Sequence, residues 1–252
     1  MPHWVPYLGL AVLPLLVICV GNPLSFAWGL QQGRKHGFKR GNEPMPPEYA
    51  LRVSRSNRYL VSVRDTLLLL VVLRLATRQS LGLSQIGFSL HGWQWSLLIG
   101  IGASLLQTGL RCFLVRLVPP GKRRLRSDET LRQWSGAYWI STNLLSVLAE
   151  EVWIAFCVVA LKHTGHSTVL SLILVAAAFG AAHFQYGFFG SLPTALWGSV
   201  SASLFLWRGS LLPSYLFHYI GNMLTKFYFA RHTAREPVSR DLPAPNPPIS
   251  GS

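Results

Sequence analysis

Apolar segments as long as membrane-spanning helices alternate along this chain with short basic segments. A helix needs about 20 apolar residues to cross the hydrocarbon core of a bilayer. Half of the 252 residues are hydrophobic and only 13% are charged, whereas soluble domains average about 25% charged residues. The chain is therefore predicted to be an all-α, polytopic membrane bundle and not a soluble globule.

Seven apolar segments are predicted to span the membrane, and the helix-breaking triplet Gly21-Asn22-Pro23 inside the first would raise the count to eight helices. The seven segments cover about residues 5–30, 60–77, 93–118, 134–161, 168–187, 191–207 and 211–230. Three regions follow: an N-terminal span with a basic loop (1–59), a membrane domain (60–230), and a disordered, proline-rich tail (231–252).

The net charge of +14 comes from basic clusters in the loops at 31–59 and 119–133 and in the tail. Seven spans starting from an outside N-terminus place all three clusters on one side, as the positive-inside rule requires. We therefore expect an integral protein of the plasma (cytoplasmic) membrane, with the basic loops and the C-terminus in the cytoplasm. No cluster is interleaved with aromatic residues, which argues against a nucleic-acid partner.

The three cysteines (Cys19, Cys112 and Cys157) lie in apolar runs without paired spacing, which excludes a disulfide framework and a cysteine-based zinc motif. The acidic residues are more informative. Glu150 and Glu151 lie inside LLSVLAEEVWIAFCVV with no cation within four residues. A carboxylate in the bilayer costs at least ~2.5 kcal/mol and is a functional candidate by default.

Asp65 is the third acidic residue in an apolar segment, and it adjoins Arg64 near the predicted start of a span. We interpret it as a structural or interfacial residue.

Two later spans carry histidines among apolar residues. Phe179 and His183 are four residues apart in LILVAAAFGAAHF, and His218 and Asn222 are four apart in SYLFHYIGNML, so each pair shares one helix face. A lone histidine of this kind is more often a packing residue. At about 1.5 Å rise per residue, however, Glu150, both histidines and Asn222 lie about 11 to 22 Å from one membrane face. They are therefore predicted to meet in one polar cavity.

Carboxylates, imidazoles and an amide at this depth fit hydrolysis. A shielded glutamate can act as general base or acid, and an imidazole and an amide can donate to an oxyanion. Other intramembrane chemistries have no counterpart here, because the sequence lacks HExxH, GxSxG, and a second aspartate in an apolar segment that could complete a dyad. The serines of GSVSAS (198–203) are spaced like small packing residues.

Three ordered motifs carry a family resemblance: EE at 150–151, FxxxH at 179–183 and HxxxN at 218–222. The strings WRGSLLPSYLFHYIGN (207–222) and RQSLGLSQIGF (78–88) add to it. Over about residues 60–230, the chain resembles the CAAX prenyl protease and bacteriocin-processing (Abi) family of glutamic intramembrane endopeptidases, which includes the Ras-converting type II CAAX protease.

The resemblance implies that Glu150 and His183 activate water, that His218 and Asn222 form the oxyanion hole, and that Glu151 supports the site. It also implies a peptide or protein substrate at the lipid bilayer. No cofactor is expected, because the two histidines lie on different spans. The alternative is a zinc ion bound by Glu150, His183 and His218.

One position departs from the family's EExxxR motif, because Ala155 stands where the motif has arginine. Its absence leaves open a diverged subfamily, a weakened enzyme, or a catalytically silent relative that acts as a membrane binding or immunity factor. A transporter that uses the same polar residues as an ion relay is a further alternative. Arg111, inside the third span, is a candidate to replace the missing arginine and pair with Glu151. Alternatively, its side chain snorkels to the basic face.

Overall fold

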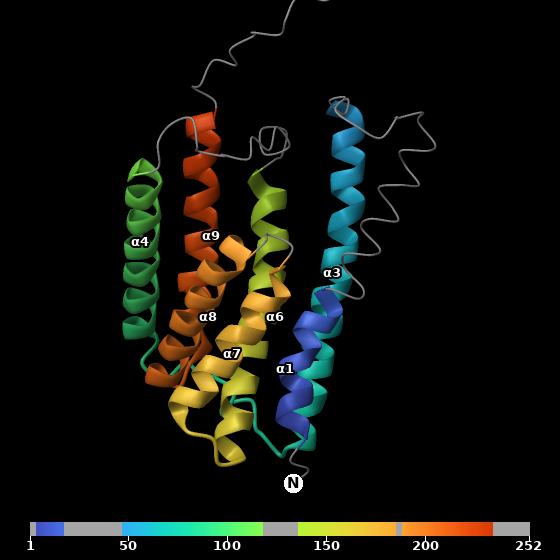
Figure 1. Ribbon diagram of the computed structural model, residues 1–252, viewed down its shortest axis with the longest axis vertical. Coiled ribbons are helices and arrows are strands. Elements are labelled where there is room, and N and C mark those ends of the chain that lie inside the picture. Colours follow the sequence, from blue (N-terminus) through green and yellow to red (C-terminus); the bar gives the residue numbers. More distant parts are fainter. Residues whose placement is uncertain (1–3, 18–46, 118–135, 185–187, 234–252) are drawn as a thin grey trace, which may run out of the picture.

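The computed structural model describes residues 4–17, 47–117, 136–184 and 188–233. Within these ranges the protein is all-α, as predicted, and its helices run side by side along one long axis (Figure 1). The helices are α1 (Val5–Leu15), α3 (Pro47–Arg78), α4 (Trp93–Leu117), α6 (Gly136–His163), α7 (Thr168–Ala182), α8 (Phe188–Arg208) and α9 (Leu211–Thr233). The predicted break at 21–23 and most of the predicted tail lie outside the described residues.

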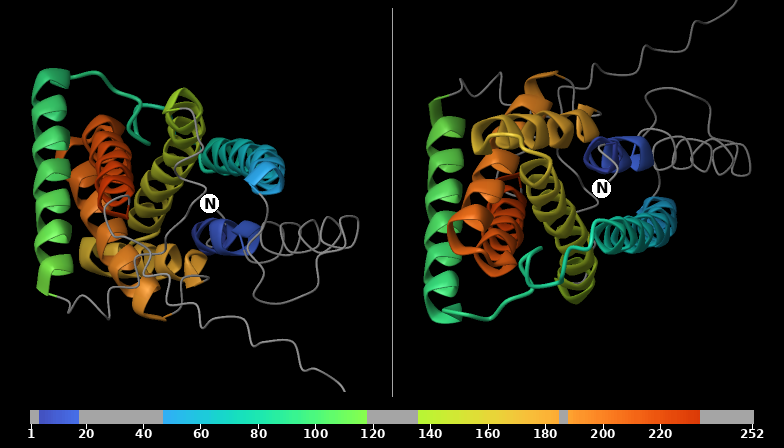
Figure 2. Two further views of the ribbon diagram at one scale, coloured as in Figure 1. Left: turned by 90° about the horizontal axis from the view of Figure 1, so that it is seen from above. Right: turned by 90° about the horizontal axis from the view of Figure 1, so that it is seen from below.

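Helix α6 is the central element of the bundle. It contacts α1 and α3 on one side and α7, α8 and α9 on the other (Figure 2), and α4 packs on the outer face of α9. Its residues from Val152 to Val158 are all fully buried, as expected for a helix that is apolar on every face. The one indole there, on Trp153, donates to the carbonyl of Gly9 at 2.7 Å, which ties α1 to α6 and satisfies the buried N–H.

Helix α3 begins well before the predicted second span. The predicted basic loop at 31–59 is helical from Pro47 onwards, and the helix continues to Arg78. Proline suits a helix start, and no glycine or proline interrupts the following residues. The prediction of a loop was wrong here because it followed hydropathy, whereas a polar segment can extend an apolar helix. Asp65 therefore lies in the middle of a helix and not near its start.

The segment between α3 and α4 is a loop that is tied to the turn between α8 and α9. Gly87, with a φ of +94°, accepts a hydrogen bond from the Leu211 amide at 2.9 Å. Ser210 Oγ donates to the Ser89 carbonyl at 2.9 Å, and Arg208 Nη2 donates to the Gly92 carbonyl at 3.4 Å. These three bonds fasten one end of the bundle.

Two of the described helices, α4 and α6, are long and apolar enough to cross a membrane. The described apolar residues of α1 and α7 form shorter helices. The span of α6 is 72% buried inside the protein, whereas that of α4 is only 17% buried and turns its large apolar side chains outward. The count of seven or eight spans remains a prediction.

Close packing of α7 on α8 depends on glycine. A Cβ atom added to Gly180 would lie 2.8 Å from the Cβ of Ala195 and 3.2 Å from the Ser191 carbonyl oxygen, whereas one added to Gly102 on α4 meets nothing within 4 Å. We expect Gly180→Ala to destabilise the protein by about 1–3 kcal/mol. We expect Gly102→Ala to stabilise it by up to about 1 kcal/mol, because alanine favours helix.

These two predictions can be tested by measuring the thermal unfolding midpoints of Gly180→Ala and Gly102→Ala in the same detergent. Equal midpoints would contradict the close α7–α8 contact.

Candidate active site

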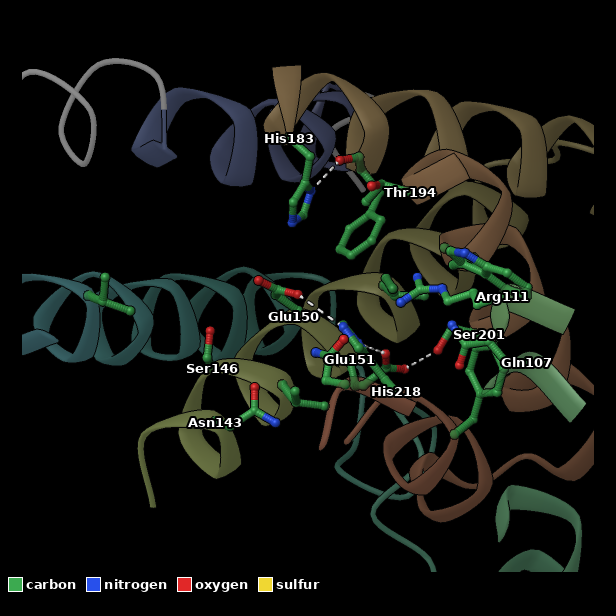
Figure 3. Close-up of a pocket in the computed structure, with 18 of the residues that line it drawn as sticks. Gln107, Arg111, Asn143, Ser146, Glu150, Glu151, His183, Thr194, Ser201 and His218 are labelled. Carbon is green, nitrogen blue, oxygen red and sulfur yellow. Dashed lines mark hydrogen bonds and ion pairs between the residues drawn. The ribbon is translucent and has the colours of Figure 1, made fainter. Parts of the chain in front are cut away.

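A cavity of about 490 Å³ opens among the helices around the middle of α6. Figure 3 shows its lining side chains converging from several helices. The cavity is lined by all five residues that the sequence analysis singled out: Glu150, Glu151, His183, His218 and Asn222. The structure thus brings together residues from α6, α9 and the end of α7, as the depth argument predicted.

A hydrogen-bonded chain joins three helices at the floor of this cavity. Glu151 on α6 accepts a bond of 2.6 Å from Ser201 Oγ on α8. Its second oxygen lies 2.8 Å from Nδ1 of His218 on α9. The Glu151 side chain is fully buried, so its two partners fix it in one position. The chain therefore orients the imidazole of His218 and directs its Nε2 away from Glu151.

Glu150 lies on the other side of the same imidazole. Its Oε2 is 3.7 Å from Nε2 of His218, which is too long for a hydrogen bond but close enough for an electrostatic contact. The Glu150 side chain is 11% exposed, whereas that of Glu151 is 0% exposed. The adjacent glutamates therefore have different positions: Glu150 faces the cavity, and Glu151 lies behind His218.

His183 lies at the C-cap of α7, and Figure 3 shows its imidazole projecting towards Glu150. Its Nδ1 is 2.8 Å from the carbonyl oxygen of Phe179, one turn earlier. The Phe179 ring contacts both imidazoles, with centroids 4.7 Å from His183 and 6.1 Å from His218. Because Nδ1 makes this backbone contact, the two ring nitrogens of His183 have different surroundings.

Comparison with known families gives an independent result. Residues 132–224 match the family model of the Rce1-like type II CAAX prenyl endopeptidases. The resemblance to the CAAX prenyl protease family is confirmed. The matched segment contains Glu150, Glu151, His183, His218 and Asn222, and therefore the whole predicted set. No curated protein and no solved structure shows significant similarity to the chain.

Ser201 is a residue of the Rce1-like segment that the sequence analysis missed. The spacing of the serines at 198–203 predicts packing residues. Ser199 and Ser203 do bond to carbonyls of their own helix, at 2.7 and 2.8 Å. Ser201 lies on the buried face of α8 instead and donates to Glu151. The only signal in the sequence was its place on a different face of the helix from its two neighbours.

The predicted ion pair between Arg111 and Glu151 is wrong. Both oxygens of Glu151 are taken by His218 and Ser201. Arg111 donates instead to Thr225 Oγ1 at 3.3 Å, and its guanidinium lies 5.3 Å from the ring centroid of Trp197. Ala155 is fully buried in the core. In this Rce1-like segment the second glutamate is thus held by neighbouring helices and not by an arginine on its own helix.

Asp65 belongs to a pair outside the Rce1-like segment. Arg64 Nη2 lies 2.6 Å from Asp65 Oδ1, and the Asp65 side chain is 1% exposed. The pairing supports the structural interpretation of Asp65, and Arg64 itself lines the cavity.

Proposed function

We propose that the protein is an integral membrane endopeptidase that hydrolyses peptide bonds with water activated by Glu150 and His183. The observation that carries this proposal is the single cavity that unites both glutamates, both histidines and Asn222 within the Rce1-like segment. The segment's match is to an endopeptidase family, which supports a protease. The glutamic mechanism is our inference from the geometry of the side chains.

In the proposed reaction, a water molecule lies between Glu150 and His183. Glu150 accepts one proton of this water while the water oxygen attacks the carbonyl carbon of the substrate. A doubly protonated His218 donates Nδ1–H to Glu151 and Nε2–H to the developing oxyanion, and the amide of Asn222 donates as well. The C–N bond then breaks, and the proton held by Glu150 passes to the leaving amine nitrogen.

The outward apolar face of α4 supports a position in the membrane. Large hydrophobic side chains on this helix, including Leu98, Leu106 and Phe113, are more than half exposed. In a membrane, the hydrocarbon core of the bilayer would surround these apolar side chains and shield them from water. With the basic loops in the cytoplasm, the protein would lie in the plasma membrane with its N-terminus outside.

A peptide library tests the proposed function. The purified full-length protein, reconstituted in liposomes, is incubated with the library, and new termini are identified by mass spectrometry. Glu150→Ala is the control that separates its activity from contaminating proteases. Cleavage by the wild type alone supports the endopeptidase. Equal product patterns from the two proteins would favour a catalytically silent relative.

Metal dependence gives a further prediction. Among the residues that the structure describes, no three His, Cys, Asp or Glu side chains are placed to hold a metal ion. We propose a metal-free mechanism and expect activity to survive prolonged dialysis against a chelator. Metal analysis should find far less than one zinc per chain. Stoichiometric zinc whose removal stops turnover would instead identify Glu150, His183 and His218 as ligands.

A further inference from the structure

Arg111 is a cation on the cavity wall that the proposed mechanism does not use. It lies on α4, is partly buried, and lines the same cavity as the two glutamates. Its contacts are neutral: the hydroxyl of Thr225 and the ring of Trp197. Among the described residues, no carboxylate lies within ion-pair distance of Arg111.

The second guanidinium on the cavity wall belongs to Arg64 and, unlike that of Arg111, has a carboxylate partner. Arg64 is neutralised by Asp65 at 2.6 Å. Arg111 has five N–H donors, of which the structure shows one in a hydrogen bond. A shielded cation without a partner carboxylate is costly to maintain. Arg111 is thus the cavity's one guanidinium, among the described residues, with its charge available to a bound anion.

Gln107 gives the same wall a second polar group. It lies four residues before Arg111 on α4, so the two side chains share a helix face. Gln107 is only 6% exposed, and its Oε1 has no hydrogen-bond partner. Figure 3 shows Gln107 and Arg111 at the opposite end of the cavity from Asn143 and Ser146, beyond His218 and Glu151. This end of the cavity therefore has an unpartnered hydrogen-bond acceptor beside the Arg111 guanidinium.

We propose that Arg111 binds a carboxylate of the peptide substrate and thereby positions the scissile bond over Glu150. The inference rests on the proposed endopeptidase function and deepens it. The planar guanidinium matches a carboxylate with two parallel hydrogen bonds, and carboxylates are the anionic groups of an unmodified peptide. The carboxylate comes either from the substrate's C-terminus or from an aspartate or glutamate side chain near the cleaved bond.

A binding experiment tests the proposal without requiring turnover. The probes are one apolar peptide with an uncharged fluorescent label, made as the C-terminal acid, as the C-terminal amide, and as the amide with one internal aspartate. Each is titrated by anisotropy into full-length Glu150→Gln protein in detergent. We expect one of the two carboxylate peptides to bind at least about 10-fold more tightly than the neutral amide. The peptide that does so identifies the source.

Two arginine variants in the Glu150→Gln background test whether Arg111 causes the preference for the carboxylate peptide. Arg111→Gln is expected to abolish the preference for the carboxylate while leaving the affinity for the neutral amide within a few-fold. Arg116→Gln, which changes an exposed cation on the same helix outside the cavity lining, should keep the preference. If Arg111 served fold stability alone, Arg111→Gln would lower the binding affinity of all three peptides equally.

Equal affinity for the three peptides, including no measurable binding of any, would overturn the proposal. A preference that survives Arg111→Gln would overturn it as well. These outcomes are independent of the cleavage assay. If library peptides were cleaved regardless of whether they carry a carboxylate, the endopeptidase function would be supported and only the proposed anion subsite at Arg111 would be contradicted.

Discussion

Replacing Glu150 by glutamine is expected to abolish cleavage, with kcat lowered by about 1,000-fold or more, while the protein still folds and inserts. The amide has nearly the same size and shape as the carboxyl group but cannot accept the proton of the attacking water. General-base catalysis contributes about 100- to 10,000-fold in enzymes. The 11% exposed carboxylate of Glu150, facing both His183 and His218, is the group placed to supply it.

The measurement is kcat for a library-derived peptide in proteoliposomes, together with the thermal unfolding midpoint. Ser146→Ala is the matched control, since Ser146 lines the same cavity one turn earlier on α6. We expect it to change kcat by less than about 10-fold, because a hydroxyl cannot act as the base. Near-normal turnover by Glu150→Gln would show that another group activates the water.

Glu151→Gln is expected to lower kcat by about 100-fold with little change in KM, although this residue does not contact the substrate. The Glu151 carboxylate holds Nδ1 of His218 at 2.8 Å. A neutral amide cannot balance the charge of a doubly protonated imidazole. In the proposed mechanism this weakens the hydrogen bond from Nε2–H to the oxyanion, and removal of one such donor costs about 100- to 1,000-fold.

Serine variants on α8 separate this positioning role from a general loss of stability. Ser201→Ala removes the 2.6 Å bond to Glu151 and should lower kcat by about 10-fold. Ser199→Ala is the control, because the Ser199 hydroxyl donates to the Leu196 carbonyl of its own helix, and it should leave kcat unchanged. If the two serine variants behave alike, and Glu151→Gln retains near-normal kcat, the hydrogen-bonded chain has no role in catalysis.

The meeting of the five polar residues could be predicted because each is conspicuous in its own segment. A carboxylate or imidazole among apolar side chains has few acceptable positions, so Glu150 and His218 had to face a shared interior. Helical rise then fixed their depth along the bundle. The all-α fold could be predicted from the same apolar segments, since every one that the structure describes is a helix.

Contacts between helices could not be predicted in the same way. Whether Ser201 or Arg111 reaches Glu151 depends on how α8 and α4 are rotated about their axes, and hydropathy does not record rotation. Arg111 could therefore be placed at the right depth and still be given the wrong partner. The start of α3 was missed for a related reason, since its first turns are polar and only the absence of helix breakers marks them.

The hydrogen bonds at Gly87, Ser89 and Gly92 have a mechanical consequence. They join the α3–α4 loop to the α8–α9 turn. The helices α4, α8 and α9, which carry Arg111, Ser201 and His218, are therefore held together at that end. Helices held at one end part most easily at the other, since local opening begins where the fewest contacts must break. The bundle should therefore open most easily at the opposite end, with this loop as the hinge, and we expect a peptide to reach the glutamates from that end.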